Sequence, residues 1–285
     1  MEQKYIKSPI NYSGSKYRLI KKGLIDLFPK DIDTFVDLFC GACNVSFNVK
    51  ANNIICNDYI NYIPELFNCW KNKSLEDINK HIDKQINEWN LSPLNKESFE
   101  NFREYYNNTK NIEDLFILIC YSFNYQMRFN NSHQYNSSFG KEASTMNDNI
   151  RKNVNIVADL IHNNNFQFVN KDFRELKIDK LTSNDFVYCD PPYLINGAVY
   201  QDGKRGFKGW GQQDDIDLME LLDQLNNKNI SFALSNVLES KGRINDKLIE
   251  WSKKYHIHYI NHSYSNANYQ REDKGDDIEV LITNY

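Results

Sequence analysis

The chain has 285 residues, of which 41% are hydrophobic, 14% aromatic and 25% charged. This composition is that of a globular protein with a sizeable core, and it excludes a disordered or fibrous chain. The formal net charge is −4, so overall charge gives no support to nucleic-acid binding, and any such site must rest on a local patch. The sequence holds no run of about 18 apolar residues, which excludes a transmembrane helix.

The N-terminal residues lack the apolar stretch of a secretory signal, so we expect none. The six cysteines show no spacing typical of a secreted disulfide framework, which indicates a reducing cytosol. We therefore expect a cytoplasmic protein without membrane contact, as a monomer or weak dimer.

The first elements in chain order form a strand, turn, helix and strand. Residues 34–39 are an apolar run that ends in a turn at Gly41, residues 44–52 are predicted to be helical, and residues 53–58 are a second apolar run that ends in an acid. This order is typical of a βαβ unit with parallel strands.

The rest of the chain contains a long helical stretch and then returning strands. Residues 64–120 carry apolar side chains at helical spacing, whereas residues 121–145 are polar, aromatic and rich in Asn, as in a hairpin with loops. Helices are predicted at 150–163, 213–227 and 243–254, and strands at 166–169, 185–189, 230–234 and 278–283. The pattern predicts an α/β fold, in which an open, mostly parallel sheet carries a mainly helical insertion.

The clearest chemical pattern is Asp190-Pro191-Pro192-Tyr193, directly after a predicted strand. Reactive residues of open α/β sheets gather at the carboxyl ends of strands, and consecutive prolines fix the backbone there. A carboxylate and a main-chain carbonyl can accept both hydrogens of an exocyclic amino group, and the tyrosine ring can stack on a base. The segment predicts a site for a planar amine, with a plain turn as the alternative.

Two further segments predict a ligand site. A turn with one glycine, Gly41, follows the first strand, and Asp58 ends the next strand where an acid can bind ribose hydroxyls. A single glycine disfavours a pyrophosphate and favours a nucleoside, with a tight βα turn as the alternative. Residues 11–16 combine a small-residue turn with the start of a helix and Lys16, which can hold a carboxylate; a plain helix start is the alternative.

Together and in this order, these segments resemble the Dam-like, D12-type N6-adenine DNA methyltransferases over nearly the whole chain. Residues 12–16 are similar to the family's aromatic–small–Gly–small–Lys motif, residues 37–41 to its cofactor motif, and residues 190–193 to its catalytic motif without departure. Cys43 stands where the last glycine of the cofactor motif is usual.

The resemblance implies a Rossmann-like, S-adenosylmethionine-dependent methyltransferase sheet. Residues 1–63 and 155–285 would form the catalytic domain, and residues 64–154 an inserted, mainly helical target-recognition domain. The implied catalytic residues are Asp190, Pro191, Pro192 and Tyr193. The implied cofactor-binding residues are Tyr12, Ser13, Gly14, Lys16, Asp37, Phe39, Gly41, Asp58, Asp172, Phe173 and Asp190.

The polar part of the insertion resembles the family's DNA-contacting hairpin. Its candidates for phosphate or base contacts are Asn124, Gln126, Arg128, Asn130 and Asn136. The glycine-rich residues 194–212 are a second candidate, with Lys204 and Arg205 for phosphates. We expect them to form a mobile loop that orders over the flipped base, with Phe207 and Trp210 filling the vacated space or covering the active site. A solvated hairpin and a plain surface loop are the alternatives.

The expected activity is methyl transfer from S-adenosylmethionine to adenine N6 in a short site of double-stranded DNA, with the base flipped out of the helix. We expect in-line attack without a metal, in a restriction–modification system with a cognate endonuclease or in an orphan methylase. Cytosine N4 methylation, RNA adenine methylation and a non-catalytic DNA-binding module remain alternatives. Cys40-x-x-Cys43 has the spacing of a redox or metal site, but its place in the cofactor turn explains it more simply. His256, His258 and His262 alternate along a predicted strand, and an exposed strand face explains them more simply than a metal site does.

Overall fold

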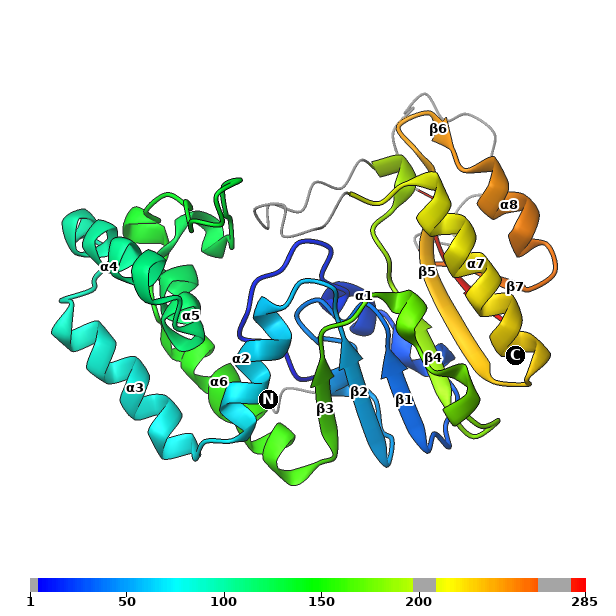
Figure 1. Cartoon of the computed structure of the whole chain (residues 1–285), viewed down its shortest axis with the longest axis horizontal. Coiled ribbons are helices and arrows are strands. Elements are labelled where there is room, and N and C mark those ends of the chain that lie inside the picture. The colour runs from blue at the N-terminus through cyan, green and yellow to red at the C-terminus, as the bar shows by residue number, and fades with distance from the viewer. Residues whose placement is uncertain (1–4, 197–208, 261–277) are drawn as a thin grey trace.

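The computed structural model describes residues 5–196, 209–260 and 278–285. Its strands are β1 (Thr34–Asp37), β2 (Asn53–Asn57), β3 (Phe166–Val169), β4 (Phe186–Cys189), β5 (Ser231–Ser240), β6 (Arg243–Ile244), β7 (His256–Tyr259) and β8 (Ile278–Thr283). They form one sheet in the order β3-β2-β1-β4-β5-β8-β7, with β6 beside β5 (Figure 1). The strands from β3 to β5 are parallel, and β8 and β7 are antiparallel. The predicted α/β fold is confirmed.

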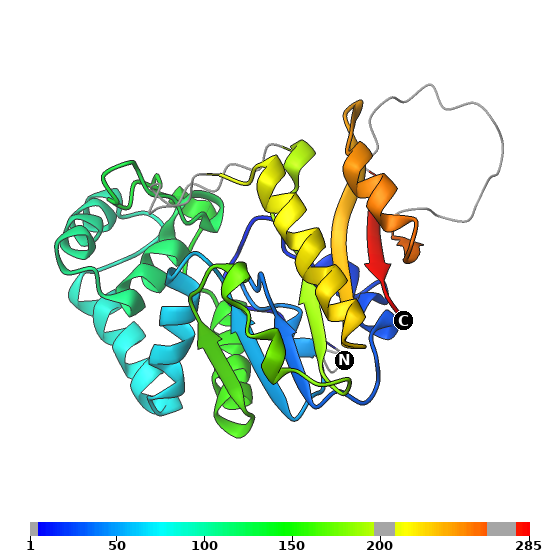
Figure 2. The same cartoon turned by 45° about the vertical axis from the view of Figure 1, so that its right-hand side comes forward.

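The α-helices of the described residues are α1 (Tyr17–Ile20), α2 (Tyr62–Lys71), α3 (Leu75–Glu88), α4 (Lys96–Thr109), α5 (Ile112–Tyr121), α6 (Asp148–Asn163), α7 (Gln212–Asn227) and α8 (Asp246–Ser252). The predicted helical stretch between the second and third strands is thereby confirmed. Figure 2 shows α3 to α5 grouped at one end of the molecule and α8 at the other, with α7 in front of the strands.

Alternate residues of the central strands enter two hydrophobic cores. Phe35 and Tyr188 belong to a core that the helices α2, α5 and α6 complete, whereas Val36 and Val187 belong to a core with α7 and α8. Because both faces of the parallel strands are covered, β4 is apolar and buried along its whole length.

Asparagine side chains set the start of several helices, which gives the Asn-rich composition a structural role. The side-chain oxygen accepts a backbone N–H of the first turn at the N-caps Asn95, Asn111, Asn147 and Asn245. Asparagine is among the preferred N-cap residues.

The helix predicted at 44–52 is wrong, because only a 3₁₀ turn, η2 (Ser46–Asn48), forms there. Val45 still has helical backbone angles, but the chain is extended again at Val49, with φ −92° and ψ 142°. The Asn48 amide also binds the backbone N–H and C=O of Ile6, which fixes the turn against the N-terminal segment.

The helix predicted at 243–254 begins later than expected. Arg243 and Ile244 pair with β5, and α8 starts only after its N-cap, Asn245. The strand predicted at 230–234 is longer than expected, because β5 continues to Ser240 alongside β8.

Residues 121–145 are a loop region with little regular structure. They contain the 3₁₀ turns η3 (Phe123–Tyr125) and η4 (Lys141–Ala143) and isolated bridges between Ser122 and Phe139 and between Phe129 and Tyr135. The Phe129 ring stacks on Tyr62 of α2 with the centroids 4.3 Å apart. We call this segment the polar hairpin; its inner aromatic side chains fix it to the helices.

Gly140 closes the base of the polar hairpin, where its N–H donates to Tyr121 O. A Cβ added there would lie 2.4 Å from Ser144 Cβ and 2.8 Å from Ser122 O.

We expect Gly140→Ala to lower the free energy of unfolding by about 3 kcal/mol, through overpacking against backbone. Gly242→Ala, where space is open but φ is +75°, should cost only about 1 kcal/mol. Equal losses in urea unfolding would contradict the packing at Gly140.

Candidate active site

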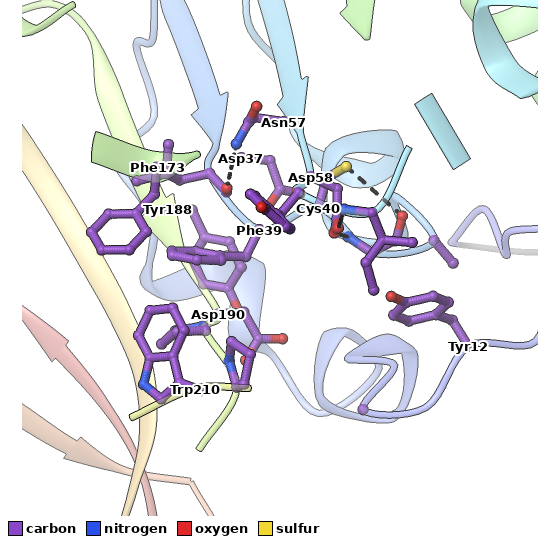
Figure 3. Close-up of a pocket in the computed structure, with 18 of the residues that line it drawn as sticks. Tyr12, Asp37, Phe39, Cys40, Asn57, Asp58, Phe173, Tyr188, Asp190 and Trp210 are labelled. Atoms are coloured by element: carbon purple, nitrogen blue, oxygen red, sulfur yellow. Dashed lines mark hydrogen bonds between the residues drawn. The ribbon is translucent and has the colours of Figure 1, made fainter. Parts of the chain in front are cut away.

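A cavity of about 640 Å³ lies at the carboxyl ends of β1, β2 and β4. The direction of strand order reverses between β1 and β4, the place where open α/β sheets bind ligands. The cavity is lined by every residue predicted for catalysis or cofactor binding: Tyr12, Ser13, Gly14, Lys16, Asp37, Phe39, Gly41, Asp58, Asp172, Phe173, Asp190, Pro191, Pro192 and Tyr193. Figure 3 shows Tyr12 on one side and Phe39, Phe173 and Trp210 on the other.

The turn after β1 requires a glycine at Gly41. Its φ is +46°, and an added Cβ would lie 3.1 Å from the Tyr12 ring. The Gly41 N–H donates to Asp58 Oδ2 at 2.8 Å, and the Ile60 N–H donates to Asp58 Oδ1 at 2.9 Å. Burial raises the pKa of Asp58 to about 6, against the lowering effect of these two hydrogen bonds. Asp58 thus joins the ends of β1 and β2 as well as lining the cavity.

Cys43 adopts a left-handed conformation with φ +59°. This geometry is one in which glycine is favoured and other residues are strained by roughly 1–2 kcal/mol, which fits the glycine that is usual at this position of the cofactor motif that the sequence resembles. Burial raises the pKa of both the Cys40 and Cys43 thiols well above the ordinary value. These thiols are therefore poorly suited to nucleophilic or redox chemistry.

Asp37 ends β1 as a buried carboxyl group. Ser46 Oγ donates to Asp37 Oδ2 at 2.5 Å, whereas Oδ1 has no hydrogen-bond partner among the described residues. Burial raises the pKa of Asp37 to about 7; the Ser46 hydrogen bond lowers it, and the charges of Asp190 and Asp58 raise it further. Asp37 therefore leaves one buried carboxyl oxygen unsatisfied beside the cavity.

Asp190 follows β4 and meets a lysine from the N-terminal segment. Lys16 Nζ lies 2.8 Å from Asp190 Oδ1, and Tyr193 OH donates to the same oxygen at 3.0 Å. Burial raises the pKa of Asp190, while the Lys16 charge and the Lys16 and Tyr193 hydrogen bonds oppose that rise. The Lys16 and Tyr193 contacts orient a mostly buried carboxylate and oppose the effect of burial, which disfavours its ionised form.

Lys16 also reaches a second carboxylate that the sequence reasoning missed. Its Nζ lies 3.8 Å from Glu279 Oε1, on β8, and donates to Gly14 O at 3.3 Å. Glu279 is 89 residues away from Asp190 in the chain, and nothing local in its strand indicates a site. Only the pairing of β8 with β5 brings it near.

Asp172 lines the cavity, but its carboxylate is already engaged. It caps the 3₁₀ turn η5 (Phe173–Glu175), and both of its oxygens accept from Arg174 Nη1 at 3.1 Å. Arg174 also binds Asp214 and Asp217 of α7 and lies over the Phe173 ring, 4.4 Å from its centroid. Asp172 therefore holds Phe173 in place through Arg174.

The five candidates for DNA contact in the polar hairpin are all exposed: Asn124, Gln126, Arg128, Asn130 and Asn136. Phe129 and Tyr135 between them point into the core. Asn11 Nδ2 donates to Asn124 O at 3.0 Å, which joins the hairpin to the segment next to the cavity. Lys204 and Arg205, with Phe207 and most of the predicted lid at 194–212, lie outside the described residues.

Metal sites and membrane helices are absent from the described part of the chain. No group of three His, Cys, Asp or Glu side chains is placed there so that it could hold a metal ion, and no helix is long and apolar enough to span a membrane. His258 Nε2 lies 3.2 Å from Thr283 Oγ1 on the neighbouring strand, and His262 lies outside the described residues.

Comparison with known proteins agrees with this geometry. The chain is 50% identical over 281 residues to the type II methyltransferase M.FokI of Planomicrobium okeanokoites, and 43% identical over 285 residues to the modification methylase StsI of Streptococcus sanguinis. These matches cover 99% of this chain but only 43% of each relative, so the chain spans less than half of their length. The type II methyltransferase M1.LlaDCHI of Lactococcus lactis subsp. cremoris is 22% identical over 96% of this chain and 94% of its own.

Residues 12–266 match the family of D12 class N6 adenine-specific DNA methyltransferases. This match includes the turn at Gly41, Asp58 and the Asp190–Tyr193 segment, which are the parts that line the cavity. The chain therefore belongs to the D12 class of N6 adenine-specific DNA methyltransferases.

Proposed function

We propose that this chain is a site-specific, adenine-specific DNA methyltransferase, which transfers a methyl group from S-adenosylmethionine to adenine N6 in a short duplex site. The geometry of Asp190 carries the proposal. Lys16 and Tyr193 both bind its Oδ1, and no described residue donates to Oδ2. An oriented carboxylate oxygen therefore remains available beside a cavity of nucleoside size.

The cavity fits S-adenosylmethionine in shape and charge. Phe39 and Phe173 suit its adenine ring, and Asp58 suits its ribose hydroxyls. When bound, this cofactor supplies an electrophilic methyl group on a positively charged sulfur. The carboxyl groups around Lys16 favour a cationic ligand of this kind.

The chemistry at the target base follows from the Asp190–Tyr193 segment. Asp190 Oδ2 accepts one hydrogen of the exocyclic amine, the Pro191 carbonyl accepts the other, and the Tyr193 ring stacks on the base. The amino nitrogen would gain positive charge as its bond to the methyl carbon forms and the bond from that carbon to sulfur breaks, and its excess proton would then pass to solvent. An ionised, fixed Asp190 stabilises that charge.

The exposed polar hairpin supplies the DNA contacts in this proposal, and the catalytic and target-recognition regions follow the division at residues 63/64 and 154/155. The relatives M.FokI and StsI are named as a type II methyltransferase and a modification methylase. By analogy, the chain acts in a bacterial restriction–modification system with a cognate endonuclease.

Nucleoside mass spectrometry tests the reaction. Mixed-sequence unmethylated DNA incubated with the chain and methyl-labelled S-adenosylmethionine should yield labelled N6-methyldeoxyadenosine. Asp190→Asn should lower the rate ~100-fold or more, because it removes a charged acceptor worth about 3 kcal/mol in the transition state. Labelled N4-methyldeoxycytidine, or label in RNA alone, would support a different methyltransferase. DNA binding without any labelled product would support a non-catalytic module.

The pH profile tests the role of Lys16. Asp190 must be ionised, so kcat/KM should fall as pH drops through its pKa. Lys16→Met removes the charge that opposes the burial-raised pKa of Asp190, so the acid limb should move to higher pH. Lys21→Met, an exposed control on the same segment, should leave the acid limb in place. If the acid limb of the pH profile of kcat/KM does not shift in Lys16→Met, Lys16 acts by packing alone.

Arg128 tests the DNA face, because it is the exposed arginine of the polar hairpin. If it binds a phosphate, Arg128→Ala should weaken binding to all duplexes and reduce the salt slope of log K by about 1. If it reads a base, discrimination should relax at one position of the site. Lys84→Ala on α3, which removes a charge paired with Glu88, is the matched control. Identical binding, slope and specificity in Arg128→Ala would exclude Arg128 from the interface.

A further inference from the structure

Trp210 lines the cavity just before α7, and a carboxylate fixes its ring. The indole Nε1–H donates to Asp215 Oδ1 at 2.5 Å. Asp215 is buried in the first turn of α7, and its other oxygen, Oδ2, accepts from Asn245 Nδ2 at 3.0 Å. Since Asn245 is the N-cap of α8, the position of the indole is set by two helices.

The other edge of the indole faces two phenylalanines of the cavity. The Trp210 ring centroid lies 5.5 Å from that of Phe39, at 79°, and 5.5 Å from that of Phe173, at 40°. Phe39 and Phe173 are themselves 5.5 Å apart. The three rings come from the turn after β1, from η5 and from the residues before α7, and they gather on the side of the cavity opposite Tyr12 (Figure 3). We call them the aromatic wall.

The surroundings of Trp210 distinguish a ligand-facing ring from a core ring. The indole is only partly buried and lines the cavity together with Phe39 and Phe173. Its polar N–H is satisfied away from the cavity by Asp215, so the surface offered to a ligand is apolar and planar. A ring that is already fixed loses little conformational freedom when a planar ligand binds.

We propose that Trp210 is a cofactor-binding residue, which completes the aromatic wall for the adenine ring of S-adenosylmethionine, and that Asp215 and Asn245 are its positioning residues. This inference rests on the proposed function. The ring contacts of Trp210 are with Phe39 and Phe173, and not with Tyr193 beside Asp190. These contacts assign Trp210 to the nucleoside cofactor and not to the target base.

The chain contains a matched control pair. Trp251 Nε1–H donates to Asp223 Oδ1 at 2.9 Å, in the same indole–carboxylate geometry, but Trp251 packs on Phe232 and Tyr255 and does not line the cavity. Trp210→Phe and Asp215→Asn can therefore be compared directly with Trp251→Phe and Asp223→Asn.

The experiment is a titration with S-adenosylhomocysteine, followed by tryptophan fluorescence and by calorimetry. In the unaltered chain, and in Trp251→Phe, ligand should change the emission; in Trp210→Phe most of this change should be lost. Trp210→Ala should raise Kd roughly five- to tenfold, as expected for one lost aromatic contact, and Asp215→Asn should raise it less. Asp223→Asn should leave Kd unchanged.

The outcomes separate this inference from the proposed function. If the unaltered chain does not bind S-adenosylhomocysteine or S-adenosylmethionine, both fail. If it binds, but Trp210→Phe keeps the full emission change and Trp210→Ala keeps the affinity, the assignment of Trp210 is overturned while the function stands. Melting temperatures without ligand identify a variant that does not fold; if Trp210→Ala is such a variant, the emission change in Trp210→Phe decides alone.

Discussion

The pairing of β1 with β4 is the interaction on which the whole cavity depends. The two strands are about 150 residues apart in the chain but run side by side from Phe35 and Phe186 onward, and the pairing continues beyond β1, where Leu38 N–H donates to Tyr188 O at 2.9 Å. This register places the end of β1, with Asp37, next to the end of β4, with Asp190. A slip of one residue would turn alternate side chains to the opposite face of the sheet.

The same pairing creates an electrostatic problem, because it gathers carboxyl groups in a poorly solvated place. The pKa values of Asp37 and Asp58 rise to about 7 and about 6, and that of Asp190 is raised as well. Lys16 stands beside only one of them, Asp190. The cavity is therefore tuned unevenly: Asp190 is biased toward ionisation by a fixed cation, whereas Asp37 can bind a proton or a ligand donor near neutral pH.

The sequence could predict what short segments determine by themselves. The turn at Gly41 and the Asp190–Tyr193 segment place consecutive residues at the end of one strand, so their position follows once the strand is identified. Glu279 could not be found in this way, because it joins the site only through the antiparallel pairing of β8. The helix predicted at 44–52 failed for a related reason, since contacts with the N-terminal segment override local propensity.

The N-terminal segment connects the parts of the site that the sheet alone leaves separate. Within six residues, Asn11 binds the backbone of the polar hairpin at Asn124, Tyr12 packs on the Gly41 turn, and Lys16 holds Asp190. Asn124 and Tyr125 both have positive φ, +52° and +56°, and two such residues in succession are retained only where surrounding contacts hold them. Asn11 supplies one of those contacts. A displacement of the hairpin would therefore act on the segment that carries Lys16. One hydrogen bond, the backbone of residues 11–16 and one ion pair connect the proposed DNA face to the carboxylate at the reacting position.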